Sequence, residues 1–359
     1  MARIIFHLGP GKCGSSAIQA FLEAASRGAD PLLDAIFVRA PEIQALEAGD
    51  TSPLGPLAAR MGAARADRPL IVSHEALFKK TGALRALVRA AVGQGGETSA
   101  LAYVRRQSDY LRSVHGQWLF REPDRVAETA GILRAEGIDP ALFTGVERQL
   151  MAFALGHVSV GRDAGGFSSF DWSVSMVQRA RELDELGVPL HVAALPPRDA
   201  DRPLLADFAA RIGVRKSDAT EAAAVVNPAF APATIEAVTN GIECGFPMPG
   251  RHEANRFLAV GDPVVQSIPL PDGALLGWLS DCIDATFEAR NRQFAERFGI
   301  DPAYFSPRRP CDPSEIGQRI AREAALRSEE PAESRQARIT ARAGAMRAAW
   351  QAFREVDRP

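Results

Sequence analysis

The sequence is short of lysine. Only four of its 42 basic residues are lysines, namely Lys12, Lys79, Lys80 and Lys216, and the rest are arginines. Because this chain uses arginine for nearly every surface cation, a lysine inside a glycine-rich turn needs another explanation than solubility. The lysine ammonium is compact and mobile, so it follows a charge that develops on an oxygen better than the planar guanidinium of arginine does. Lys12, which lies in such a turn, is therefore the first candidate functional residue.

Three further features are absent, and each absence excludes a class of protein. The four cysteines are scattered without a C-x-x-C pair, which disfavours a disulfide framework and a zinc site. Neither an apolar run of about 18 residues nor a signal-peptide pattern occurs, so we expect no membrane span and a cytoplasmic protein. The net charge is only -2 at pH 7, which gives no electrostatic reason to expect nucleic acid or an anionic membrane as a partner.

Short aliphatic runs alternate with helical patterns in the first half of the chain. The predicted strands are 3–8, 69–73, 101–104 and 189–195, with a weaker one at 35–40. The predicted helices between them are 16–25, 82–92, 109–120 and 174–186. This alternation predicts an α/β fold with a central, mainly parallel sheet flanked by helices. Ligands bind such sheets at the carboxyl ends of the strands, so we expect the loops after Leu8, Ser73 and Val104 to lie together.

The remainder of the chain is predicted to be mostly helical. Residues 121–169 are expected to form a loop-and-helix insertion on the acceptor side of the site. Nearby aromatic residues are candidate walls of an acceptor site, although a place in the core explains them equally well: Trp118, Phe120, Phe167, Phe170 and Trp172. We expect one α/β domain over 1–311, followed by an Arg-, Ala- and Glu-rich helical tail over 312–359. A sparse apolar stripe on that tail indicates packing on the body or on a partner chain, in which case the protein is a homo-oligomer.

The stretch "RIIFHLGPGKCGSSAIQAFL", residues 3–22, has the pattern of a strand, a glycine-rich loop and a helix. A turn that enters a helix presents unpaired N–H groups, and the helix dipole favours an anion there. Gly9, Gly11 and Gly14 let the backbone approach a ligand closely. Ser15 and Ser16 can cap the helix and donate to phosphate oxygens. The alternative is a tight turn in which Ser15 only caps the helix, but such a turn does not need Lys12.

The spacing differs from that of the common triphosphate loop, G-x-x-x-x-G-K-[ST]. Here Lys12 precedes the last glycine, Gly14, instead of following it. A P-loop small-molecule kinase is therefore disfavoured, and it remains the alternative enzyme. The other alternative is a non-catalytic protein that keeps such a fold and only binds a nucleotide.

A second motif, "LAYVRRQSDYLRSVHGQWL", covers residues 101–119. Arg105 follows a predicted strand, and Ser113 lies eight residues later on a predicted helix. An arginine offers a forked, permanent charge to a phosphate, and a serine hydroxyl adds one donor. Arg106 is the competing candidate for the phosphate contact, at a spacing of seven residues from Ser113. The alternative is that both arginines only form surface ion pairs.

The two motifs together resemble those of sulfotransferases, particularly bacterial members with a loop of the form K-x-G-[ST]-[ST]. Cys13, Ser15 and Ser16 stand where that pattern often has threonines, and the resemblance extends loosely over residues 1–308. It implies a P-loop NTPase-like sulfotransferase fold and 3′-phosphoadenosine 5′-phosphosulfate (PAPS) as donor. The donor-binding residues that it implies are Gly11, Lys12, Cys13, Gly14, Ser15, Ser16, Arg105 and Ser113. It implies no metal.

The resemblance also implies a reaction, the in-line transfer of a sulfuryl group to a hydroxyl or amine of a carbohydrate or small metabolite. Lys12 and the helix N–H groups stabilise the charge on the leaving phosphate oxygen. A general base must remove the proton of the acceptor. Glu75, after the strand 69–73, is the first candidate for that base, and His74, His7 and His115 compete with it.

Overall fold

The computed structural model describes residues 1–359 except 28–29, 156–170, 198–202, 215–229, 247–272 and 357–359. The chain divides into two compact units. The first comprises 1–105, 162–228 and 289–305, and the second comprises 106–161, 229–288 and 306–359. The two units thus alternate along the chain, whereas the sequence analysis placed a single boundary at residue 311. The C-terminal segment 312–359 belongs to the second unit.

The first unit contains a sheet of five parallel strands, which confirms the expected α/β class. The strand order is β2-β3-β1-β4-β5. The bounds are β1 Arg3–His7, β2 Asp34–Phe37, β3 Leu70–Ser73, β4 Glu97–Val104 and β5 Leu190–Ala194. The central strand, β1, ends with His7 paired to Ser73 of β3 and to Leu101 of β4. The loops that follow β1 and β3 therefore leave the sheet at the same edge.

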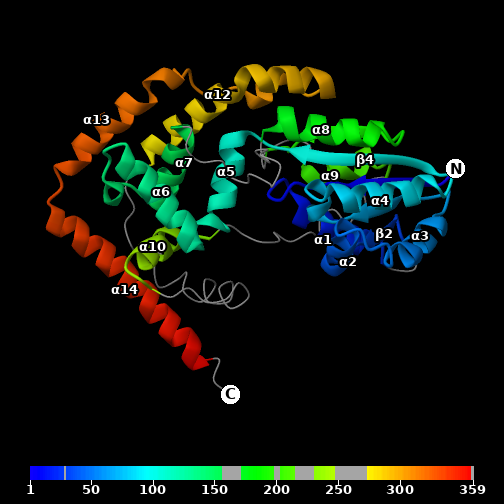
Figure 1. Ribbon diagram of the computed structural model, residues 1–359, viewed down its shortest axis with the longest axis horizontal. Coiled ribbons are helices and arrows are strands. Elements are labelled where there is room, and N and C mark those ends of the chain that lie inside the picture. Colours follow the sequence, from blue (N-terminus) through cyan, green and yellow to red (C-terminus); the bar gives the residue numbers. More distant parts are fainter. Residues whose placement is uncertain (28–29, 156–170, 198–202, 215–229, 247–272, 357–359) are drawn as a thin grey trace. The chain divides into compact units, whose positions relative to one another are not determined.

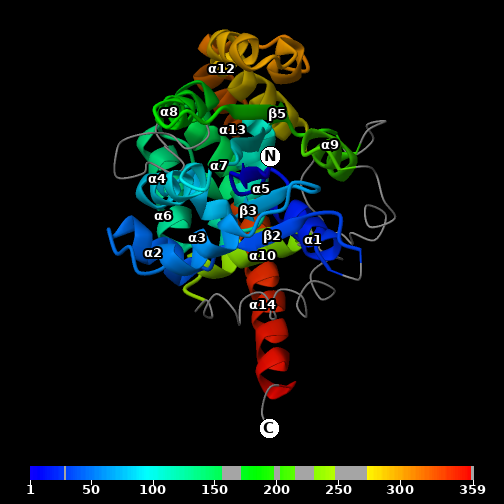
Figure 2. The same ribbon diagram turned by 90° about the vertical axis from the view of Figure 1, so that its right-hand side faces the viewer.

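Helices cover both faces of this sheet, as a parallel sheet requires. Their bounds are α1 Ser15–Ala25, α2 Ala40–Glu47, α3 Leu54–Gly62, α4 Thr81–Val92, α8 Trp172–Asp184 and α9 Leu204–Arg211, with short 3-10 turns at η1 Glu75–Phe78 and η5 Pro302–Phe305. Figure 2 shows α1 and α9 on one side of the sheet and α3, α4 and α8 on the other. The fully buried Phe208 of α9 packs its ring against those of His7, Phe21 and Tyr103. This cluster fixes α9 beside the end of β1.

The second unit is helical in its described part. Its helices are α5 Gln107–His115, α6 Pro123–Ala135, α7 Gly145–Ala154, α10 Pro232–Glu243, α13 Ile316–Ser328 and α14 Ala332–Val356, with the 3-10 turns η2 Leu119–Arg121, η3 Pro140–Leu142 and η6 Pro313–Glu315. Helix α12, Ala274–Phe298, begins in this unit and ends in the first. Helix α14 lies beside α10 (Figure 1), where Met346 is fully buried in a cluster with Phe120 and Val238. The apolar stripe of the C-terminal segment therefore packs within its own unit.

The longest described helices, α12 and α14, have 25 residues each. Both carry charged side chains along their length. Within the part of the chain that the structure describes, no helix combines the length and the apolar character that crossing a membrane requires.

The cysteine analysis needs a correction, because the structure joins Cys282 and Cys311 in a disulfide. Cys282 lies on α12 and Cys311 lies just before η6, with Cα atoms 5.3 Å apart. The two residues are 29 positions apart in a chain without cysteine motifs, so only the fold brings them together. The other two cysteines are free: Cys13 is buried and Cys244 is exposed.

The start of α5 is held by a buried carboxylate. Asp284 of α12 accepts hydrogen bonds from the backbone N–H (3.0 Å) and the hydroxyl (2.8 Å) of Ser108. The guanidinium of Arg106 lies 3.8 Å from the same carboxylate. This long-range cap explains why α5 begins at Gln107, two residues before the predicted start. Burial raises the pKa of Asp284 to about 7, although Ser108 and Arg106 oppose the shift.

This pKa predicts a pH-dependent stability. Between about pH 4 and pH 7 the folded state binds more protons at Asp284 than the unfolded state, so the free energy of unfolding falls as the pH rises through that window. Asp284→Asn keeps an acceptor for Ser108 but carries no charge. We therefore expect this variant to gain stability relative to the wild type on going from pH 5 to pH 8, as measured by urea unfolding. An equal stability difference at the two pH values would contradict the assignment.

Candidate functional site

The loop between β1 and α1 has an unusual backbone. Lys12 adopts φ 68° and Gly14 adopts φ 86°, and Lys12 is the one non-glycine residue with positive φ in the described part of the chain. The left-handed region is unfavourable for a residue with a Cβ, and such strain occurs mainly at functional sites. The N–H of Cys13 donates to the carbonyl of Pro10 at 3.2 Å and closes the turn between them. The candidate lysine therefore sits at the strained point of the loop.

Two glycines of the loop have no room for a side chain. A Cβ on Gly9 would lie 2.0 Å from the Ser15 hydroxyl oxygen, and a Cβ on Gly14 would lie 2.4 Å from a methyl group of Leu204. Real Cβ atoms do not approach other atoms this closely. The close packing of backbone against α1 and α9 thus requires glycine at both positions.

The predicted capping role of Ser15 is wrong. Gly14 is the N-cap of α1, and no side chain of the described residues caps this helix. The buried Ser15 hydroxyl instead donates to the Pro10 carbonyl at 3.2 Å, inside the loop. The N–H groups of the first turn of α1 lack acceptors within the helix, and the helix dipole adds a partial positive charge there. This end of α1 can accept an anion.

Cys13 contributes to the loop through its backbone and its small size. Its side chain is fully buried. Burial raises the pKa of the Cys13 thiol to about 12, so the thiol stays neutral at physiological pH. A neutral thiol adds no negative charge to the loop.

Arg105 reaches the loop from the end of β4. Its Nη1 donates to the backbone carbonyl of Lys12 at 3.1 Å. Its own carbonyl accepts a hydrogen bond of 2.7 Å from the indole N–H of Trp172, the first residue of α8. The Nε of Arg105 is buried and has no hydrogen-bond partner among the residues that the structure describes. The two motifs found in the sequence are thus in direct contact through Arg105 and Lys12.

Ser113 lies on α5 in the second unit and is partly exposed. Its pairing with Arg105, from the spacing of eight residues, stays a prediction. The competing residue, Arg106, donates to the carbonyl of Ser306 at 2.8 Å. Arg106 therefore has a structural role in holding the start of α5.

His7 is a packed residue and not an exposed base. Its Nδ1 lies 2.9 Å from the hydroxyl oxygen of Ser73, and both side chains are buried. Burial lowers the pKa of His7 to about 4, so the ring is neutral near pH 7. Its Nε2 is buried, and no described residue forms a hydrogen bond with it. This pair ties the ends of β1 and β3 together beneath the loop.

Glu75 begins η1 immediately after β3 and is partly exposed. The neighbouring His74 uses its Nδ1 to accept from the N–H of Ala76 at 3.0 Å, which caps η1. Burial lowers the pKa of His74, although the nearby Glu75 opposes the shift. His115 is buried on α5, and burial together with the charge of Arg148 lowers its pKa to about 3. Among the candidate bases, Glu75 and His74 are partly exposed, whereas His7 and His115 are buried.

The candidate aromatic walls of an acceptor site need correction. Phe120 and Trp172 are fully buried, and each packs in the interior of its unit. Trp118 is partly exposed. Phe167 and Phe170 lie outside the described residues. The sequence could not separate these cases, because an aromatic side chain looks the same in a core and in a binding wall.

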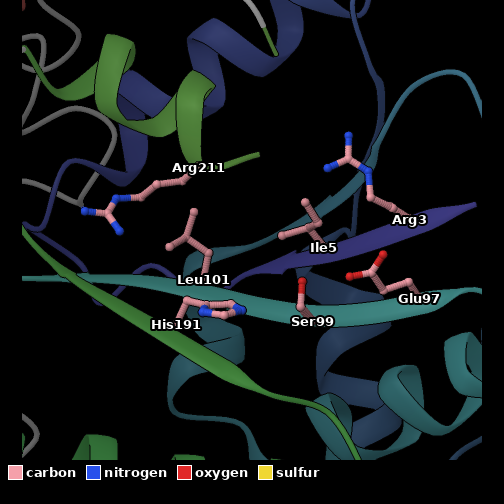
Figure 3. A pocket seen from close by; sticks show the side chains of 7 residues that line it. All are labelled: Arg3, Ile5, Glu97, Ser99, Leu101, His191 and Arg211. Atoms are coloured by element: carbon pink, nitrogen blue, oxygen red, sulfur yellow. The ribbon is translucent and has the colours of Figure 1, made fainter. Parts of the chain in front are cut away.

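A hollow of about 250 Å³ lies on the sheet of the first unit, away from the loop. Its lining residues are Arg3, Ile5, Glu97, Ser99, Leu101, His191 and Arg211. Figure 3 shows the apolar side chains of Ile5 and Leu101 in its middle and arginines on opposite sides. Arg3, Glu97 and His191 lie in the first two residues of β1, β4 and β5, whereas parallel sheets bind ligands at the carboxyl ends. The loop around Lys12 remains the better candidate for the active site.

The chain matches no family model, no curated protein and no solved structure.

Proposed function

We propose that this protein is a PAPS-dependent sulfotransferase. The observation that carries the proposal is the contact between Arg105 and Lys12 at the N-terminus of α1. It brings the permanent cation of Arg105 to the glycine-rich loop that carries Lys12, next to a helix end that favours an anion. The resemblance of both sequence motifs to those of sulfotransferases selects the donor among phosphate-containing nucleotides.

The residues present fit such a donor. Glycine at positions 9 and 14 lets the loop backbone pack closely against Ser15 and Leu204 and adopt φ 86° at Gly14. The buried, unpartnered Nε of Arg105 is a donor that still needs an acceptor. A phosphate oxygen is the strongest acceptor for a guanidinium N–H. When bound, the donor supplies the sulfuryl group and a phosphate leaving group.

Each residue then has a distinct task. The first turn of α1 and Lys12 bind the 5′-phosphate side of the donor, and the Lys12 ammonium stabilises negative charge on the oxygen that leaves. Arg105 binds the 3′-phosphate and so selects nucleotides that carry it. Glu75 accepts the proton that the acceptor hydroxyl loses as its oxygen bonds to sulfur. The acceptor is a carbohydrate or a small metabolite.

The proposed role of Glu75 predicts that its replacement lowers the transfer rate but not the nucleotide affinity. Glu75→Gln is nearly isosteric and cannot accept the proton, so the transfer rate should fall by about 10²–10⁴-fold with little change in nucleotide affinity. His74→Gln is the matched control, because it alters the neighbouring cap of η1 without removing the carboxylate. We expect this control to retain most of the rate. A slow His74→Gln beside an active Glu75→Gln would move the base to the histidine.

A screen with labelled donors tests the activity. The protein is incubated with sulfur-labelled PAPS or with γ-labelled ATP and Mg²⁺, together with panels of sugars, phenols, peptides and lipid-linked glycans. We expect the sulfate label to appear on an acceptor. Transfer of the phosphate label without the sulfate label would favour the small-molecule kinase instead.

A further inference from the structure

Arg105 contacts the backbone of the loop, which a residue that only binds phosphate does not need to do. Its guanidinium donates to the carbonyl of Lys12, the residue with φ 68°. A left-handed backbone at a residue with a Cβ is unfavourable and persists only where neighbouring contacts enforce it. A charge-assisted hydrogen bond to the carbonyl of that residue is such a contact.

Arg105 is itself held in place. The indole of the fully buried Trp172 donates to the Arg105 carbonyl at 2.7 Å. Trp172 begins α8, whose N-cap residue, Asp171, forms an ion pair with Arg290 at 2.6 Å. The backbone of Arg105 is therefore held in place. Its guanidinium, through the hydrogen bond to the Lys12 carbonyl, holds the loop in turn.

We infer that Arg105 is a positioning residue for the phosphate loop, in addition to the 3′-phosphate contact that rests on the proposed function. The guanidinium holds the Lys12 carbonyl and so keeps the loop in its binding conformation before any nucleotide arrives. Loss of Arg105 then weakens the grip on the 5′-phosphate as well as on the 3′-phosphate. Binding of the 5′-phosphate and binding of the 3′-phosphate therefore both depend on the Arg105 side chain.

Two ligands separate this inference from the simpler role. Calorimetry compares 3′,5′-diphosphoadenosine with adenosine 5′-phosphate, which lacks the 3′-phosphate. For Arg105→Gln we expect weaker binding of both, with at least a 5-fold loss for adenosine 5′-phosphate, the lower end of typical coupling between sites. The exposed Arg112 supplies the charge control, and Arg112→Gln should change neither affinity.

A ligand-free measurement completes the test. Hydrogen exchange of the amides in residues 11–16 should be faster in Arg105→Gln than in the wild type, and Arg105→Lys should restore part of the protection. Trp172→Phe, which removes the indole donor but keeps an aromatic ring, provides a second variant. This variant should also show faster hydrogen exchange at the same amides. Unchanged exchange, with unchanged affinity for adenosine 5′-phosphate in Arg105→Gln, would overturn the inference. If the wild type bound neither nucleotide, the proposed function would fail, while the exchange rates would still decide the role of Arg105.

Discussion

Replacing Lys12 by glycine should lower the rate of sulfuryl transfer by about 10²–10³-fold, the usual effect of losing one donor to a developing oxyanion. Nucleotide affinity should fall much less, because the ammonium matters most when charge develops on the leaving oxygen. Glycine is the informative replacement, since φ 68° is unstrained without a Cβ. The measurement is a comparison of kcat with the nucleotide Kd, using an acceptor that the labelled screen identifies.

Lys12→Ala is the matched control for backbone strain. Alanine removes the ammonium and retains the Cβ, so its loss of rate should equal that of glycine, with a somewhat larger loss of nucleotide affinity. A glycine variant that transfers sulfate at the wild-type rate would show that Lys12 has no catalytic role. A large rate difference between the two variants would instead assign the effect to loop conformation.

Gly9→Ala is expected to be the most damaging substitution in the loop. Its Cβ would lie 2.0 Å from the hydroxyl oxygen and 2.8 Å from the Cβ of Ser15, with the ring of His7 also close at 3.1 Å. Ser15 and His7 are both buried, so neither side chain can move away freely. We expect a loss of about 1–3 kcal/mol in unfolding free energy, the usual range for overpacking. Binding of 3′,5′-diphosphoadenosine should be lost in the same variant.

A rescue series tests the steric cause. Ser15→Ala removes only the hydroxyl oxygen, and Ser15→Gly removes both Ser15 atoms that the new Cβ would meet. Combined with Gly9→Ala, these changes should restore stability in that order. Gly131→Ala in α6 is the control, because nothing lies within 4 Å of a Cβ there, and it should leave stability unchanged or slightly higher. If Gly9→Ala had the same urea midpoint of unfolding as the wild type, the close contact between position 9 and Ser15 would be contradicted.

Much of the first unit follows from local sequence. The predicted strands 69–73 and 189–195 correspond to β3, Leu70–Ser73, and β5, Leu190–Ala194, because aliphatic runs mark strands buried on both faces. The start of β4 was missed, since Glu97, Thr98 and Ser99 are polar, and Ser99 faces the hollow instead of the core. The strand order required knowledge of contacts between distant segments.

The site could be predicted only in part, for a similar reason. Glycine spacing and the lysine deficit pointed to the loop, and the position after a strand pointed to Arg105. The left-handed backbone of Lys12 and the hydrogen bond from Arg105 depend on how β1 and β4 lie side by side. The same holds for Trp172, whose indole is committed to Arg105, and for Asp284, which caps α5 from 176 residues away. Such long-range partners leave no local pattern.

The central claim is that the loop binds a nucleotide with phosphates at both the 3′ and 5′ positions. Titration calorimetry of the full chain with 3′,5′-diphosphoadenosine, and separately with ATP and Mg²⁺, tests it most directly. We predict tight binding of 3′,5′-diphosphoadenosine and weak or no binding of ATP. Tight binding of ATP with Mg²⁺, and none of 3′,5′-diphosphoadenosine, would contradict the account.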